Sequence, residues 1–163
     1  MIMDVIEEFA QALPKTGALI GLDLGTKTIG VAISDGLRSV ATPVETIKRS
    51  KFSLDLQQLE AHIYTRDIKG LILGLPRNMD GSEGPRCQST RAFAQNLTRH
   101  ITIPISFWDE RLSTVAAEKA LLEANTSRRR RANVIDHVAA SYILQGVLNR
   151  LQHILTQNVV VTR

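Results

Sequence analysis

The chain has 163 residues, 44% of them hydrophobic, and a formal net charge of +4. This length suits one domain with a substantial core and leaves little for a second. No apolar run is long enough to span a membrane, and the acidic start MIMDVIEEFAQALPK does not resemble a secretory signal. Cys87 is the only cysteine, which excludes an internal disulfide and a multi-cysteine metal site and favours a cytoplasmic location.

Apolar spacing predicts the elements in chain order. Ile6, Phe9 and Leu13 lie at helical spacing, so the N-terminal extension 1–16 is expected to hold a short amphipathic helix. We expect a single domain over 17–155 and a C-terminal tail over 156–163. The expected elements of the domain are strands at 18–24, 29–34 and 39–47, a helix at 52–66, a strand at 69–75, a helix at 85–99, a strand at 103–108, a helix at 113–124, a basic loop and a helix at 133–154.

The order of these elements predicts the fold class. Three successive strands favour an antiparallel meander, and the later strand–helix–strand passages favour parallel crossovers. The expected fold is therefore α/β, with a mixed five-stranded sheet and helices on both faces.

The first carboxylate in an apolar setting lies in IGLDLGTKTIGVAISD, residues 20–35. The two apolar runs predict a hairpin, and Asp23 lies inside the first, where burial destabilises its charged form. Strand alternation places Gly21, Asp23 and Gly25 on one face, which leaves that face open to another backbone or a ligand. The simpler explanation is an aspartate that hydrogen-bonds the adjoining turn.

The second carboxylate, Glu110, follows the strand in IPISFWDER. Ligands tend to bind at the carboxyl ends of strands in open α/β sheets. Alternation places Glu110 with Trp108 and puts Asp109 on the opposite face. The simpler explanation is a solvated acidic pair with Arg111 as its partner.

The third carboxylate is Asp136, in the predicted helix NVIDHVAASYILQGVL. Asp136, Ala140, Ile143 and Val147 share one apolar face, so Asp136 is expected to pack inward with it. An inward aspartate needs a partner. The simpler explanation is stabilisation of the helix N-terminus, since Asp136 falls in the first turn of the predicted helix. Its neighbour His137 points about 100° away and is expected at the side of the helix.

A shared cation would account for all three carboxylates. Converging carboxylates repel one another unless a cation lies among them, and Mg²⁺ or Mn²⁺ suits an all-carboxylate site. A pair of such ions can promote hydrolysis of a phosphodiester. Together with a basic surface, this points to cleavage of nucleic acid, on the hypothesis that the three side chains converge.

Four ordered motifs resemble the YqgF/RuvX family of Holliday junction resolvases and pre-16S rRNA nucleases. They are GLDLGTKTIGVAISD, GLPRNMDGSEGP, DERLST and DHVAASYILQ, and the resemblance runs from about residue 17 to about residue 151. It implies an RNase H-like fold related to RuvC, with Asp23, Glu110 and Asp136 as metal-binding catalytic carboxylates. The lysine-rich stretch that many relatives carry before the last aspartate is here Arg128–Arg131.

The resemblance also implies the reaction and its partners. We expect an endonuclease that uses Mg²⁺ or Mn²⁺, with two ions, and leaves 5′-phosphate and 3′-hydroxyl ends. Its expected substrate is precursor 16S rRNA, processed at the 5′ end during ribosome biogenesis, and the alternative substrate is branched DNA. Ribosomal precursor particles are expected partners, membranes are not, and both a monomer and a homodimer stay open.

Basic residues beside the motifs are the expected contacts with nucleic-acid phosphates. They are Lys27, Arg77, Arg86, Arg111, Arg128, Arg129, Arg130 and Arg131. Each has a plainer alternative: Arg111 pairs with Asp109, and the arginine run is a solvated, flexible stretch. Asp35 fits turn chemistry, with a remote role as a fourth carboxylate.

Two other functions compete with a nuclease. GLDLGT also looks like the first phosphate motif of actin-like ATPases and sugar kinases, which bind nucleotide between two such lobes, whereas 163 residues supply one. The second is a ribosome-assembly factor that binds RNA and has lost catalysis. The presence of all three carboxylates argues against that loss.

Overall fold

The computed structural model describes the backbone of residues 1–112 and 128–161, and the side chains of 1–112 and 137–157. Its strands are β1 (Leu19–Leu24), β2 (Thr28–Ser34), β3 (Ala41–Lys48), β4 (Gly70–Leu75) and β5 (Ile105–Asp109). Its helices are α1 (Ile6–Ala12), α2 (Phe52–Thr65), α3 (Pro85–Thr98) and α5 (Arg128–Val161), with a 3-10 turn η1 (Glu110–Leu112). The helix predicted over 113–124 lies outside the described residues.

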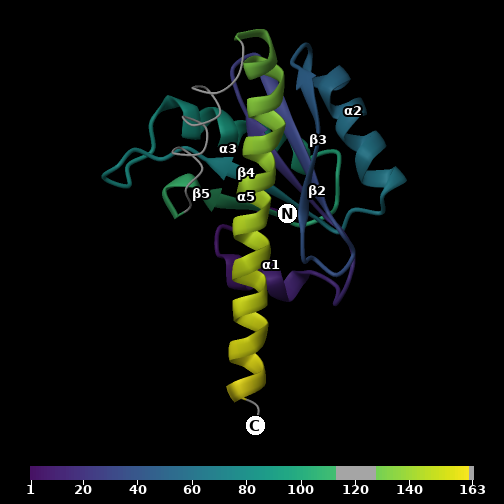
Figure 1. Cartoon of the computed structure of the whole chain (residues 1–163), viewed down its shortest axis with the longest axis vertical. Coiled ribbons are helices and arrows are strands. Elements are labelled where there is room, and N and C mark those ends of the chain that lie inside the picture. The colour runs from purple at the N-terminus through teal and green to yellow at the C-terminus, as the bar shows by residue number, and fades with distance from the viewer. Residues whose placement is uncertain (113–127, 162–163) are drawn as a thin grey trace.

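The five strands form one mixed sheet, which lies behind α5 in Figure 1, and their order is β3-β2-β1-β4-β5. β1 pairs antiparallel with β2, and β2 with β3, because short turns join them. β4 lies parallel to β1, and β5 lies parallel to β4. The helices α2 and α3 make the long connections that parallel pairing requires. The predicted meander followed by parallel crossovers is confirmed.

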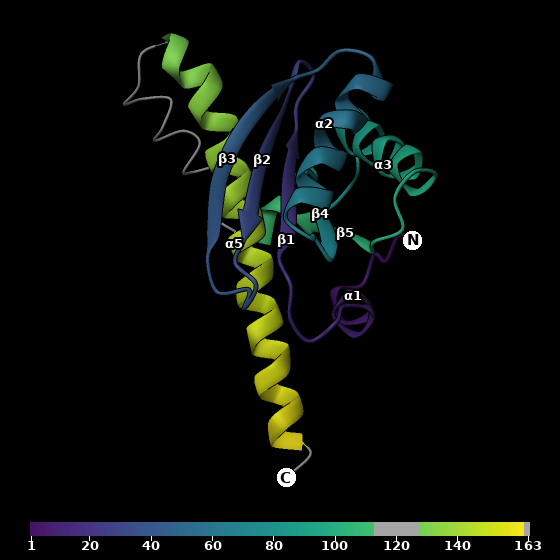
Figure 2. The same ribbon diagram turned by 90° about the vertical axis from the view of Figure 1, so that its right-hand side faces the viewer.

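Helices cover both faces of this sheet, as predicted (Figure 2). On one face, side chains from β1, β2, β4 and β5 pack with α2 and α3 in a single apolar cluster. On the other face, a second cluster joins α1 and α5 to the sheet. Gly21 lets α5 come close, because an added Cβ would lie 2.8 Å from Cβ of Leu144.

Residues 1–12, here called the N-terminal segment, are tied to the edge of β5. The amide of Met3 donates to the carbonyl of Ile105 at 2.8 Å, and the amide of Ile105 donates to the carbonyl of Met1 at 2.9 Å. The hydroxyl of Ser106 donates to the carbonyl of Met3 at 2.6 Å. The segment then forms α1, whose Phe9 is fully buried in the cluster beneath α5. It is therefore part of the packed body of the protein.

The helix α5 begins earlier and ends later than the predicted 133–154. Its first turn is Arg128–Arg131, which the sequence placed in a loop, and its last residue is Val161. Arginine and alanine favour helix, and neither proline nor glycine follows Gly146 before residue 161. The lower part of α5 extends beyond the strands (Figure 1). Within the described residues, no helix is both long and apolar enough to cross a membrane.

Candidate functional site

Asp23 lies on the face of the sheet that α5 covers. Gly21, two residues earlier on β1, contacts α5, and strand alternation puts Asp23 on the same side. Asp23 is buried, with 6% of its surface exposed. Gly30 lies opposite it on β2, so β2 itself contributes no side chain on that flank of the carboxylate.

The other flank of Asp23 carries a glycine and the second carboxylate. β4 runs in register with β1, where Leu22 pairs with Leu73, so Gly74 lies next to Asp23. A Cβ added at Gly74 would be 2.8 Å from Oε1 of Glu110. The Glu110 carboxylate thus occupies the space above Gly74, beside Asp23. The structure brings these two predicted site residues together.

The turn that carries Glu110 is held by its two neighbours. The backbone amide of Arg111 donates to Oδ1 of Asp109 at 3.0 Å, which closes the start of η1. The Arg111 guanidinium donates to Oδ2 of Asp109 at 2.7 Å. The pairing of Arg111 with Asp109 that the sequence offered as an alternative is therefore present, and it fixes the backbone on both sides of Glu110.

Asp136 belongs to α5, and its side chain lies outside the described residues. Because α5 begins at Arg128, Asp136 is more than two turns from the helix start. Stabilisation of the helix N-terminus falls off within the first turn, so this alternative for Asp136 is wrong.

The residue after Asp136 shows where this part of α5 crosses the sheet. Nδ1 of His137 lies 2.9 Å from Oγ1 of Thr46 on β3. Thr46 pairs with Gly30, which pairs with Asp23. The α5 backbone at His137 therefore crosses the sheet at the level of Asp23. The sequence did not single out Thr46, whose importance appears only when the strand register is known.

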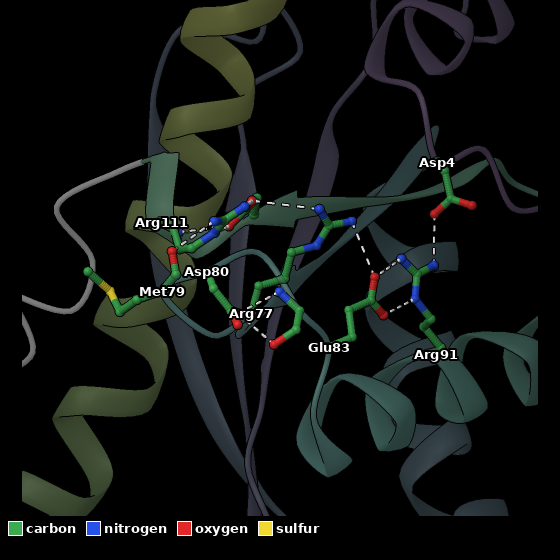
Figure 3. Close-up of polar contacts among 9 residues, drawn as sticks. Asp4, Arg77, Met79, Asp80, Glu83, Arg91 and Arg111 are labelled. Atoms are coloured by element: carbon green, nitrogen blue, oxygen red, sulfur yellow. Dashed lines mark hydrogen bonds and ion pairs between the residues drawn. The ribbon is translucent and has the colours of Figure 1, made fainter.

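Two arginines expected to contact phosphate are paired within the protein (Figure 3). Besides holding Asp109, Arg111 donates to the carbonyl of Met79 at 3.3 Å. Arg77 lies 3.3 Å from a carboxylate oxygen of Glu83 and 3.9 Å from one of Asp109. These contacts join the loop after β4 to the end of β5.

The same network continues to the N-terminal segment (Figure 3). Arg91 on α3 donates to both oxygens of Glu83, at 2.6 and 2.8 Å, and to Asp4 at 2.8 Å. We call the whole series the ion-pair chain: Asp4, Arg91, Glu83, Arg77, Asp109 and Arg111. Asp4, Glu83 and Arg91 were not predicted, because Asp4 lies 87 residues from Arg91 and the position of Glu83 depends on the geometry of the loop after β4.

The ion-pair chain shifts the pKa of its acids. Hydrogen bonding to Arg111 holds the pKa of Asp109 below its ordinary value, against the opposing effect of burial. The bidentate contact with Arg91 likewise lowers the pKa of Glu83. Both acids are therefore ionised near neutral pH, as a structural ion pair requires.

The other predicted site residues lie apart from this network. Lys27, in the turn after β1, and Arg86, in the first turn of α3, are exposed. The side chains of Arg128–Arg131 lie outside the described residues. Oδ1 of Asp35 accepts the amides of Ser39 and Val40 at 2.8 and 2.9 Å, which confirms turn chemistry for Asp35.

The residues present fit a hard divalent cation. Two carboxylates lie on one face of the sheet, between Gly30 and Gly74, neither of which contributes a side chain of its own. Such oxygen ligands suit Mg²⁺ or Mn²⁺, which often keep several waters. Among the side chains that the structure describes, no group of three potential metal ligands is assembled. The side chain of Asp136 is not one of those described.

A family model described as "RuvX: Holliday junction resolvase" matches residues 17–150. The chain belongs to the RuvX family. Two similar relatives carry the name "Putative pre-16S rRNA nuclease". The one from Ruegeria sp. (strain TM1040) is 70% identical over 154 residues, covering 94% of this chain and 98% of the relative. The one from Ruegeria pomeroyi is 68% identical, covering 94% of this chain and all of the relative.

Solved structures of two resolvases are similar to the RuvX chain in fold. Thermus thermophilus RuvC, in complex with a Holliday junction substrate, has a TM-score of 0.52 and 8% identity, covering 83% of this chain and 96% of RuvC. The yeast mitochondrial Holliday junction resolvase Ydc2 has a TM-score of 0.52 and 12% identity, covering 91% of this chain and 86% of Ydc2. At these identities the similarity concerns the fold, which is that of RuvC-like resolvases.

Proposed function

We propose that this chain is a metal-dependent endonuclease that hydrolyses phosphodiester bonds in nucleic acid. The observation that carries this proposal is the position of the Glu110 carboxylate above Gly74, next to the buried Asp23. Membership of the RuvX family, whose model is described as a Holliday junction resolvase, supports it independently.

Asp23, Glu110 and Asp136 are the proposed ligands of two Mg²⁺ or Mn²⁺ ions. When bound, such ions would stabilise the negative charge that develops on the phosphate during hydrolysis. The sequence placed Asp136 on the inward face of its helix. The crossing of α5 at the level of Asp23, through His137 and Thr46, supports its membership of the site.

The protein contributes position and space to the reaction. Burial removes Asp23 from bulk water, which strengthens its interaction with a cation. Asp109 and Arg111 fix the turn that aims Glu110. Gly30 presents no side chain beside Asp23, which favours access of a phosphate group on that flank, and Gly74 makes room for the carboxylate of Glu110.

Precursor 16S rRNA is the proposed substrate, cut during processing of its 5′ end. The names of the relatives from Ruegeria support this choice. We further propose that the protein acts in the cytoplasm on ribosomal precursor particles. The second candidate is resolution of branched DNA, which the description of the family model favours.

The decisive experiment offers both substrates to wild-type protein and to Asp23→Asn, with Mg²⁺, Mn²⁺ or chelator. We expect cleavage only with metal, and a rate lowered by about 100-fold or more in Asp23→Asn, because a preorganised charge at the reacting centre is lost. Labelled strands resolved by electrophoresis give the rates and show which substrate is cut.

The matched control is Asp67→Asn, the same change at an exposed acid paired with Lys69. It should cleave at the wild-type rate, and circular dichroism should show that both variants are folded. Equal rates for Asp23→Asn and wild type would contradict the active-site assignment. Binding of precursor RNA without cleavage in any metal would instead support the assembly-factor alternative.

A further inference from the structure

Some of the cations that the structure describes are paired with acids, and others are not. One group lies within 4 Å of an acid and is largely neutralised by it; its members are Lys69, Arg77, Arg91, Arg111 and Arg150. A phosphate could bind these side chains only by competing with an existing partner. The loop after β4 therefore offers less available positive charge than its sequence indicates.

Lys27 and Lys48 belong to the second group. Both are exposed, and neither makes an ion pair with any residue in the described part of the chain. They are neighbours in the sheet: Lys48 pairs with Thr28, and the amide of Arg49 donates to the carbonyl of Lys27 at 2.9 Å. Two available cations thus lie together at the end of β3 and in the turn after β1.

Strand alternation shows which way Lys48 points. Glu45 and Ile47 face α2 and α3: Glu45 lies 3.2 Å from His62 on α2, and Ile47 is buried in the cluster on that face. Thr46 faces α5, where it contacts His137. Lys48, two residues after Thr46, therefore projects from the face that carries Asp23.

Lys48 is also close enough to act on the same substrate. Its Cα lies two strands across and two residues along from Asp23, which is roughly 12 Å at ordinary strand spacings. A lysine side chain spans part of that distance. If the phosphate to be cleaved lies above Asp23, the ammonium group of Lys48 can bind a neighbouring phosphate of the same strand. Lys27 lies in the turn beyond the same end of β1.

We propose that the nucleic-acid strand to be cut crosses the β3 side of the site, where Lys48 and Lys27 bind its phosphates. The loop arginines Arg77 and Arg111 instead hold the loop and the turn at Glu110. This inference rests on the proposed nuclease function and adds the path of the substrate. Exposed lysines without acidic partners lose little on binding a phosphate, and release of counterions from the strand favours the contact.

Binding in the absence of cleavage tests the path directly. A short fluorescein-labelled single-stranded RNA is titrated with protein in chelator, at several KCl concentrations, and anisotropy is recorded. We expect Lys48→Gln to weaken binding about fivefold at low salt and to reduce the slope of log K against log[salt] by about 0.7, and Lys27→Gln to do the same. The double variant should lose about twice that slope.

Lys69→Gln is the matched control, because Lys69 already pairs with Asp67 and its loss should leave affinity and slope unchanged. Lys48→Arg should restore binding, since it keeps the charge. Wild-type affinity and slope in both Lys48→Gln and Lys27→Gln, or no binding by the wild type, would overturn the proposal. If the lysines matter but no metal supports cleavage, the surface stands and the nuclease function fails.

Discussion

At the scale of single residues, the site depends on two glycines, which have no side chains. Asp23 has Gly30 on one flank and Gly74 on the other, so two neighbouring strands present only backbone beside a buried carboxylate. A sheet interior normally fills such positions with apolar side chains. Here the space above Gly74 is occupied by the carboxylate of Glu110 and the end of the Ile143 side chain.

Gly74→Ala should lower both the cleavage rate and the stability. The added methyl would lie 2.8 Å from Oε1 of Glu110 and 2.5 Å from Cδ1 of Ile143. Ile143 is fully buried and branched at Cβ, so it can move aside only at a cost of about 1–3 kcal/mol, and we expect a lower melting temperature. Displacing Glu110 by about 1 Å should lower the cleavage rate by up to about 100-fold.

Gly36→Ala serves as the control for this prediction, because nothing lies within 4 Å of a Cβ built there. Its cleavage rate and melting temperature should match wild type. Unchanged cleavage by Gly74→Ala would show that the position of Glu110 does not matter for the reaction.

Much of the site's arrangement at this scale could be predicted from sequence. Alternation along each strand grouped Asp23 with Gly21 and Glu110 with Trp108, and the convergence of the two carboxylates remained a hypothesis until the strand register was known. The role of Gly74 could not be predicted, because it depends on how β4 aligns with β1. The ion pairs of Arg77 with Glu83 and Asp109 could not be predicted either, because they depend on the conformation of the loop after β4.

At the scale of elements, the N-terminal segment is held by one large side chain. Phe9 is fully buried between α1 and the sheet, and a Cβ at Gly70 would lie 2.8 Å from Cζ of its ring. Phe9→Ala should lower the free energy of unfolding by about 3–5 kcal/mol, since it removes a large buried ring and leaves a cavity. Chemical denaturation measures the change.

Val5→Ala is the comparison for Phe9→Ala, because Val5 is 48% exposed and lies just before the same helix. Its effect should stay within about 0.5 kcal/mol. A loss of similar size in both variants would mean that α1 does not dock through Phe9.

The type and order of the elements could be predicted, but some of their limits could not. Apolar spacing located the helix α2 to within a residue, because its buried positions repeat regularly. The start of α5 was missed, since Arg128–Arg131 carries no apolar signal and was interpreted as a loop. The pairing of Met1 and Met3 with Ile105 depends on packing across the whole chain.

At the scale of the whole molecule, the ion-pair chain links the N-terminal segment, α3, the loop after β4 and the end of β5. The pKa of Asp109 is lowered in the folded protein by its hydrogen bond to Arg111. The ionised form therefore stabilises the fold above the unfolded pKa of about 4. That stabilisation is lost as the pH falls through the lower folded pKa.

Asp109→Asn should therefore change the pH dependence of stability. Near neutral pH the variant should unfold at lower urea concentration than wild type. The difference should shrink steadily below about pH 4, where wild-type Asp109 also becomes neutral. Urea denaturation at a series of pH values measures this, and a difference that stays constant into acid would contradict the assigned cause.

The ties of the N-terminal segment also determine when it can take its place during synthesis. Asp4 pairs with Arg91, 87 residues later in the chain, and Met3 accepts a hydrogen bond from Ser106, 103 residues later. Glu7 pairs with Arg150, 143 residues later. None of these partners exists while the first half of the chain emerges from the ribosome. Closing loops of this length costs entropy that local contacts avoid. The residues made first therefore complete their contacts only after nearly all the others have been made.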